Sequence, residues 1–242
     1  WLETVARRAG KPLLLGTVYT ESSNEPGERW FNGAFVVDPV AGLVRPGYAK
    51  RQLVPFGEFI PLRPVLGWIE KFAPIGGDFQ RGTDAAPLPV PVGPRRVPVG
   101  VLICFEDIFP GLARESALDG AEVLAVLTNN AWFGEGGAAY QHAAHSVLRA
   151  IETRRPVIRV GNGGWSGWID EFGNVRATVL DETGRVYFRG AQTVAVTRDQ
   201  RWVGRQSYYT LHGDWFLLVC VGLVAGAYFA GVPVGQIQPN RV

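Results

Sequence analysis

The sequence predicts an α/β fold with a parallel sheet at its centre, and two observations lead to this prediction. Three short apolar runs rich in valine, isoleucine and leucine lie at 97–103, 121–130 and 157–161, which is typical of strands buried on both faces. Helical patterns separate these runs, at 105–118 and 138–155. Because a strand–helix–strand–helix–strand series favours parallel pairing, we expect functional side chains at the carboxyl ends of the strands.

The residues before this series predict a helix and further strands. Residues 1–11 have the pattern of an amphipathic helix, and the apolar runs 12–19 and 30–38 are typical of strands. Leu43–Leu53 is expected to return as a hairpin partner. The stretch 73–95, rich in glycine, proline and alanine, indicates a loop.

The composition excludes some function classes. The 242 residues are 47% hydrophobic and carry a formal net charge of +2 without basic runs, so nucleic-acid binding has no support. Two cysteines do not make a disulfide framework. The sequence holds no methionine and opens on Trp1, so we expect further sequence to have preceded it.

The C-terminal part differs from the rest. Residues 164–197 predict hairpins, with a last strand at 192–197. Trp215 opens a run of 18 residues without a charge, long enough at about 1.5 Å per residue nearly to span a bilayer core of roughly 30 Å. The alternative is a buried terminal helix. We expect a catalytic domain at 1–205, a linker at 206–214, a membrane-spanning helix at 215–234 and a tail at 235–242.

Cys104 ends the apolar run that begins at Val97, and a helix start follows it. Backbone N–H groups and the positive end of a helix dipole there favour a thiolate and would stabilise an oxyanion. The alternative is an inert buried thiol, which is common for free cysteine. Glu106, two residues on, favours a polar site, because a carboxylate is rare in a packed core. Asn129 and Asn162 end the two neighbouring strands and are expected at the same sheet edge.

Lys50 stands out because arginine supplies nearly all other cations of this chain. A compact ammonium suits oxyanion stabilisation or proton transfer, although a solvated lysine is the simpler interpretation. The next segment, 53–62, surrounds a single carboxylate, Glu58, with prolines, a glycine and aromatic residues. Such a loop is expected to be rigid and apolar, with one polar tip.

Two helical segments allow more than one interpretation. Residues 64–72 have the spacing of one helical face, and the 56–72 arm is either a lid or membrane-facing arm, or an ordinary surface helix. On the 138–155 helix we expect the core face to consist of Ala144, Val147, Leu148 and Ile151. His142 and His145 have a spacing that suits a metal but lack further ligands, so helix packing and hydrogen bonds explain them better.

Four stretches together resemble a known family. They are Tyr48–Pro61, Ile103–Glu106, Thr128–Gly134 with Gln141 and His142, and Arg159–Asp170. In this order they resemble the nitrilase-like domain of the apolipoprotein N-acyltransferases, over residues 1–200. The segment after residue 214 resembles the last transmembrane helix of that family.

The resemblance implies an α/β/β/α sandwich on the periplasmic side of a bacterial inner membrane. Cys104 would attack an ester of a phospholipid to give a thioester, Lys50 would stabilise the oxyanion, and Glu106 and Glu58 would hold the lysine. The thioester would pass its acyl chain to the amino group of a diacylglyceryl-modified apolipoprotein. No cofactor or metal is implied. The candidate residues of the substrate pocket are Phe105, Asn129, Trp132, Phe133 and Asn162.

The chain departs from the family pattern in two places. The general-base glutamate of the family precedes the helix with which this sequence begins, so we expect residues 1–242 alone to be inactive. Asn130 stands where the family often has aspartate.

Two other functions remain open. One is an amidase or nitrilase that acts on a small carbon–nitrogen substrate, which leaves the 215–232 run unexplained. The other is a non-catalytic, membrane-tethered binding domain, in which Cys104 would be unreactive.

Overall fold

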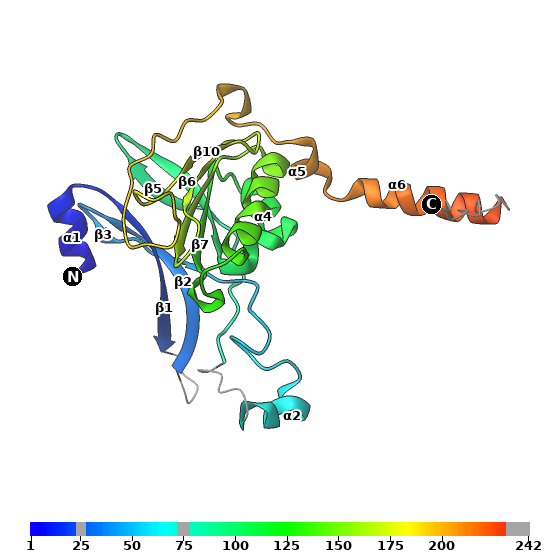
Figure 1. The fold of residues 1–242 in the computed structure, drawn as a ribbon, viewed down its shortest axis with the longest axis horizontal. Helices are drawn as coiled ribbons and strands as arrows, with labels where there is room; N and C mark the ends of the chain where they lie inside the picture. Colours follow the sequence, from blue (N-terminus) through cyan, green and yellow to red (C-terminus); the bar gives the residue numbers. More distant parts are fainter. Residues whose placement is uncertain (23–27, 72–77, 231–242) are drawn as a thin grey trace.

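Two β-sheets packed face to face form the centre of the molecule (Figure 1). The computed structural model describes residues 1–22, 28–71 and 78–230. Within these residues the larger sheet has six strands in the order β10-β9-β8-β7-β6-β5. They are β5 (Leu88–Val92), β6 (Arg95–Ile103), β7 (Val123–Asn129), β8 (Val157–Asn162), β9 (Gly167–Ile169) and β10 (Val175–Thr178). As predicted, β6, β7 and β8 are parallel.

The second sheet is antiparallel and centres on β2. Its strands are β1 (Leu13–Ser22), β2 (Glu28–Asp38), β3 (Gly42–Leu43) and β4 (Tyr48–Ala49). The segment predicted as a hairpin partner, 43–53, pairs antiparallel with β2 as expected, but only through the two short strands β3 and β4 rather than along its whole length. Pro46 lies between them and has no backbone N–H to donate, which explains the interruption.

Helices cover both outer faces of the sandwich. On the larger sheet, α3 (Pro110–Leu118) and α4 (Ala138–Thr153) pack over buried side chains such as Leu102, Leu124 and Val126. On the second sheet, α1 (Leu2–Ala9) contacts β2 and buries Ala6. Val36, Val101 and Ile103 lie between the sheets. The layers are therefore α/β/β/α, as the resemblance implied.

Three details of the sequence prediction are wrong. Residues 88–92 form β5 rather than a loop; β5 lies at the sheet edge, where its prolines are tolerated. Residues 192–197 form no strand. Of the predicted core face of α4, Val147 packs against the core, whereas Ala144, Leu148 and Ile151 are exposed. The apolar residues that α4 buries are small, namely Ala139, Ala143 and Ala150. Small side chains let α4 approach the sheet closely, which the apolar spacing did not reveal.

Short helical turns connect these elements. They are α2 (Arg63–Leu66) and the 3₁₀ turns η1 (Gly67–Lys71), η2 (Cys104–Ile108), η3 (Ala131–Phe133) and η4 (Gln200–Trp202). The predicted 64–72 helix is thus α2 followed by η1, and its last residue, 72, lies outside the described residues. Together α2 and η1 extend away from the sheets (Figure 1).

The C-terminal segment leaves the sandwich as a separate helix. The predicted linker, 206–214, contains α5 (Tyr208–His212), whose Leu211 carbonyl accepts a hydrogen bond from Arg114 Nη2 at 3.1 Å. Beyond it, α6 (Trp215–Phe229) projects from the body of the molecule and buries none of its residues (Figure 1). Among the described helices, none combines the length and the apolar character that crossing a membrane requires. The predicted span continues to 234 and the predicted tail follows, so both extend into 231–242, outside the described residues.

Candidate active site

Cys104 occupies a strained backbone position at the end of a central strand. β6 ends at Ile103 and η2 begins at Cys104, with a backbone φ of 55°. This left-handed conformation is rare for residues other than glycine and costs on the order of 1–3 kcal/mol. The thiol is partly buried. Such a position is retained only when surrounding contacts enforce it, and the two carboxylates that follow Cys104 supply these contacts.

Glu106 joins this strained turn to the segment that carries Lys50. Its fully buried carboxylate accepts hydrogen bonds from the Ile103 and Arg51 backbone N–H groups, both at 2.7 Å. It also accepts from the Gln52 N–H at 2.9 Å and the Tyr48 hydroxyl at 2.8 Å. Burial raises the pKa of Glu106 in spite of these four donors. Glu106 therefore fixes the backbone on both sides of the site.

Lys50 is buried and paired with Glu58. Its side chain is 1% exposed, and Nζ donates to Oε2 and Oε1 of Glu58 at 2.8 and 2.9 Å. Asn32 Nδ2 and the Val54 N–H also donate to this carboxylate, at 3.0 and 2.9 Å. The resemblance implied that both glutamates hold the lysine. In the structure Glu58 binds the ammonium directly, whereas Glu106 acts on its neighbours Arg51 and Gln52.

The Lys50 segment lies beside the Cys104 turn. Lys50 Nζ is 5.5 Å from the centre of the Phe105 ring, a cation–π distance, and Phe105 directly follows the cysteine. Gly82 supports this segment from the other side, since its N–H donates to the Lys50 carbonyl at 2.9 Å. A Cβ at Gly82 would lie 2.1 Å from the Ala49 carbonyl oxygen, so only glycine permits this approach.

Asp107 holds the opposite side of the turn. Its fully buried carboxylate accepts from Ser146 Oγ at 2.7 Å and Arg159 Nη1 at 2.5 Å, and it lies 2.9 Å from His142 Nε2. Burial alone would raise the pKa of Asp107, but the His142 hydrogen bond and the Arg159 charge outweigh it and lower the pKa. Asp107 thus ties η2 to α4 and to β8.

The sequence prediction missed most of this buried network. It assigned no role to Asp107 or Ser146, and it placed Arg159 only within a resembling stretch. One signal was available: Glu106 and Asp107 are consecutive acids after a buried strand, and two such residues require polar partners. The His142 ring nitrogens lie 2.9 Å from Asp107 Oδ1 and 3.3 Å from Asn130 Oδ1, and the described residues contain no group of acidic, histidine or cysteine side chains that could hold a metal ion.

The other pocket candidates lie at the predicted sheet edge. Asn162 Nδ2 donates to Asn129 Oδ1 at 3.2 Å, which joins the ends of β8 and β7. Trp132 and Phe133, in η3, are 84% and 64% exposed and contribute apolar surface to solvent. Asn130 is buried, and its Oδ1 accepts from the Thr128 hydroxyl at 2.8 Å.

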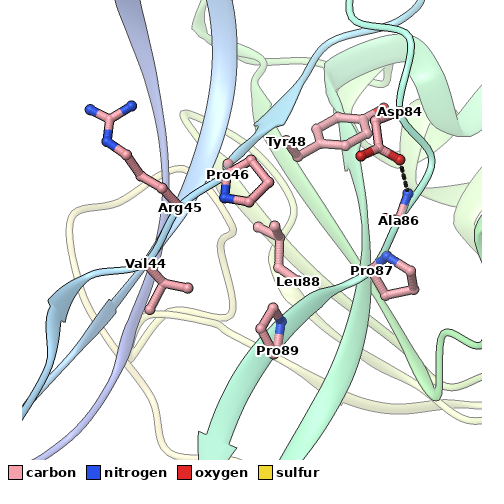
Figure 2. A pocket seen from close by; sticks show the side chains of 10 residues that line it. Val44, Arg45, Pro46, Tyr48, Asp84, Ala86, Pro87, Leu88 and Pro89 are labelled. Carbon is pink, nitrogen blue, oxygen red and sulfur yellow. Dashed lines mark hydrogen bonds between the residues drawn. The ribbon is translucent and has the colours of Figure 1, made fainter.

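Tyr48 also lines a separate pocket of about 210 Å³. The segments 44–48 and 84–89 line it, with Pro46, Tyr48, Pro87 and Leu88 around the space and Asp84 bonded to the Ala86 N–H (Figure 2). Neither Cys104, Lys50 nor Glu58 lines this pocket. The pocket is therefore distinct from the site around the thiol.

Comparison with known proteins places this arrangement in a family. The family described as "Carbon-nitrogen hydrolase" matches residues 1–208, which is most of the chain. The chain belongs to the carbon-nitrogen hydrolase family. Among solved structures, an amidase from Nesterenkonia sp. AN1 shares 20% identity and covers 74% of this chain and 62% of its own, with a TM-score of 0.53. At this identity the likeness concerns the fold.

Several curated relatives of this chain share one name. Apolipoprotein N-acyltransferases from Geobacter metallireducens and Methylococcus capsulatus are each 35% identical to it, over 91% and 95% of the chain. A third, from Thermotoga maritima, is 33% identical over 82%. The chain spans only about two fifths of the length of these relatives, 39% and 42% for the first two.

Proposed function

We propose that this chain is the catalytic part of an apolipoprotein N-acyltransferase with Cys104 as its nucleophile. The observation that carries the proposal is the buried Lys50–Glu58 pair beside the strained turn of Cys104. Curated relatives with this name support the choice of reaction. A thiol, an ammonium and carboxylates are the kinds of group that acyl transfer through a covalent intermediate uses.

In the first half-reaction the Cys104 thiolate attacks the carbonyl carbon of a phospholipid ester. The C–S bond forms, and Lys50 stabilises the charge on the carbonyl oxygen of the tetrahedral intermediate. The carbon–oxygen bond to the glycerol then breaks, and the leaving alkoxide takes up the proton that a general base removed from the thiol. We expect that general base to be a glutamate that precedes residue 1, as the resemblance implies.

In the second half-reaction the free amino group of a diacylglyceryl-modified apolipoprotein attacks the thioester. The amide bond forms, the carbon–sulfur bond breaks, and the amine proton passes to the same general base as the thiolate is restored. Two separate displacements on one thiol predict ping-pong kinetics.

Exposed apolar side chains favour a lipid substrate and a membrane location. Leu62, Val65 and Trp68 are 74%, 70% and 59% exposed around α2 and η1, and Trp132 extends the apolar surface near the end of β7. The charge-free α6, which buries none of its residues, supports attachment to the bacterial inner membrane, with the sandwich on its periplasmic side. The membrane-spanning helix at 215–234 belongs to this proposal.

Amide hydrolysis is the second candidate, because the Nesterenkonia amidase has the same fold. The full-length protein separates the two. With phospholipid and a diacylglyceryl peptide we expect N-acylated peptide and lysophospholipid, both abolished by Cys104→Ser and unchanged by Cys220→Ser. Release of ammonia from small amides without lipid turnover would instead support the amidase, and wild-type activity of Cys104→Ser would exclude both.

A further inference from the structure

The turn that carries Cys104 lies between two buried ion pairs, of which the proposed mechanism uses only one. Lys50–Glu58 lies on the side of the second sheet, beside the Phe105 ring. Arg159–Asp107 lies on the side of α4 and β8, with both side chains fully buried. The second pair has no role in the acyl transfer described above, although Asp107 is only three residues from the thiol.

Arg159 is held at one edge of its guanidinium only. Nη1 donates to Asp107 Oδ2 at 2.5 Å and to Ser146 Oγ at 2.9 Å. Nε and Nη2 are buried and have no hydrogen-bond partner among the described residues. Leaving buried donors unpaired is costly, and each such group in a folded protein therefore calls for an explanation. One edge of this cation is therefore available to a negative charge.

Asp107 connects Arg159 to the turn of the thiol, because the carboxylate that Arg159 binds lies in η2, three residues after Cys104. Burial lowers the pKa of Arg159, and the negative charges of Asp107 and of a Cys104 thiolate oppose that effect. A guanidinium keeps its charge in such surroundings, whereas a buried lysine would readily lose it. In a water-poor environment a charge acts more strongly on a nearby developing negative charge than it does in water.

We propose that Arg159 is an electrostatic positioning residue that stabilises the Cys104 thiolate. Asp107 holds the guanidinium in place, and its negative charge weakens the stabilisation that the guanidinium gives to the thiolate. Because this inference concerns the thiol named as nucleophile, it rests on the proposed function. His142 and Ser146 on α4 orient the Asp107 carboxylate, and Arg149 Nη1 donates to its backbone carbonyl at 2.9 Å.

Other charged groups around the thiol set the background for any pH dependence. They are Lys50 and Glu58 next to β4, Glu106 and Asp107 on η2, His142 and Arg149 on α4, and Arg159 on β8. The test therefore changes Arg159 and Asp107 separately and leaves the remaining groups in place.

Alkylation of Cys104 by iodoacetamide measures the reactivity of the thiolate without lipid or general base. The 242-residue chain with Cys220→Ser leaves Cys104 as its single thiol. We expect Arg159→Met to slow alkylation at pH 7 about tenfold and to shift its pH profile upward by about one unit. Asp107→Asn removes the opposing negative charge, so its profile is expected to shift downward.

This opposite response separates electrostatic positioning from a structural role. Loss of either partner of a buried pair loosens the turn, so a purely structural role predicts that both variants change in the same direction. In Arg159→Lys the buried ammonium would readily lose its charge, so this variant is expected to slow alkylation as Arg159→Met does rather than to behave like the wild type. The matched control is Asp170→Asn. Asp170 is also buried and is bonded to an arginine, Arg176, at 2.6 Å, but it lies in the turn after β9. The pH profile of alkylation is expected to be unchanged in this variant.

Folding is checked by circular dichroism. If Arg159→Met does not fold, the double variant Asp107→Asn/Arg159→Gln is used instead, because it leaves no unpaired buried charge. It is compared with the single variant Asp107→Asn, and the loss of the guanidinium must again slow alkylation. Profiles that shift together, or do not shift, overturn the inference while the proposed function stands. A wild-type Cys104 that iodoacetamide does not alkylate overturns both.

Discussion

The ammonium of Lys50 lies within 2.9 Å of both carboxylate oxygens of Glu58, eight residues further along the chain. Because the lysine is almost fully buried, this carboxylate is the group that balances its charge, and the Asn32 amide and the Val54 N–H donate to the carboxylate and hold it in place. The 53–62 loop thus does more than cover the site. It supplies the counter-charge that keeps a cation beside the Cys104 turn.

Replacing Glu58 by glutamine tests this role. The amide cannot accept from all of Lys50, Asn32 and Val54 at once, so we expect a loss of about 3 kcal/mol of stability and at least a tenfold fall in thioester formation. Urea unfolding and single-turnover acylation measure the two effects. Glu70→Gln, in an exposed pair with Arg63, is the control and is expected to cost less than about 1 kcal/mol.

Glu106→Gln is expected to loosen both sides of the site. Its carboxylate accepts hydrogen bonds from three backbone N–H groups and one hydroxyl. The NH₂ group of glutamine can only donate, and a backbone N–H cannot accept a hydrogen bond from it. We predict a loss of about 2–3 kcal/mol of stability together with slower alkylation of Cys104. An unchanged rate in a folded variant would show that this carboxylate does not position the thiol.

Asp107 predicts an acid-dependent contribution to stability. Its folded-state pKa lies below the ordinary value of 3.8, so its contribution is present above about pH 4 and is lost as pH falls through the folded-state pKa. The difference in unfolding free energy between wild type and Asp107→Asn should therefore shrink between pH 5 and pH 2. Chemical denaturation at a series of pH values measures it, and a difference that stays constant contradicts the assignment.

Gly82→Ala tests the close approach that supports Lys50. The new Cβ would meet the Ala49 carbonyl at 2.1 Å, so the backbone before Lys50 must move. We expect about 2 kcal/mol lower stability and slower acylation. Gly111→Ala, in α3, meets nothing within 4 Å and should leave both unchanged; equal effects of the two substitutions would exclude a role for the contact.

The sequence predicted the parallel strands, Cys104 at the end of β6, and the polar residues that end β7 and β8. The strands could be predicted because a strand that is buried on both faces consists of a nearly continuous run of apolar residues. The contacts of Asp107 were not predictable, because they join residues 35 to 52 positions apart, and no local pattern records such pairing. The same holds for α4, whose buried face is defined by small side chains and by polar partners of Asp107 rather than by its largest apolar residues.

The hydrogen bonds of Glu106 could be predicted only in part from the sequence. A carboxylate after a buried strand indicated a polar site, but not that it would bind the backbone at residues 51 and 52. Those contacts depend on how the two sheets pack, which the sequence pattern left open.

The central claim is that Cys104 carries the acyl group during transfer. Full-length protein is mixed with phospholipid in the absence of an acceptor, and the peptide that contains Cys104 is analysed by mass spectrometry. The account predicts one acyl chain on Cys104, removable by hydroxylamine and transferred when a diacylglyceryl peptide is added. An active enzyme whose Cys104 remains unmodified throughout turnover would contradict it.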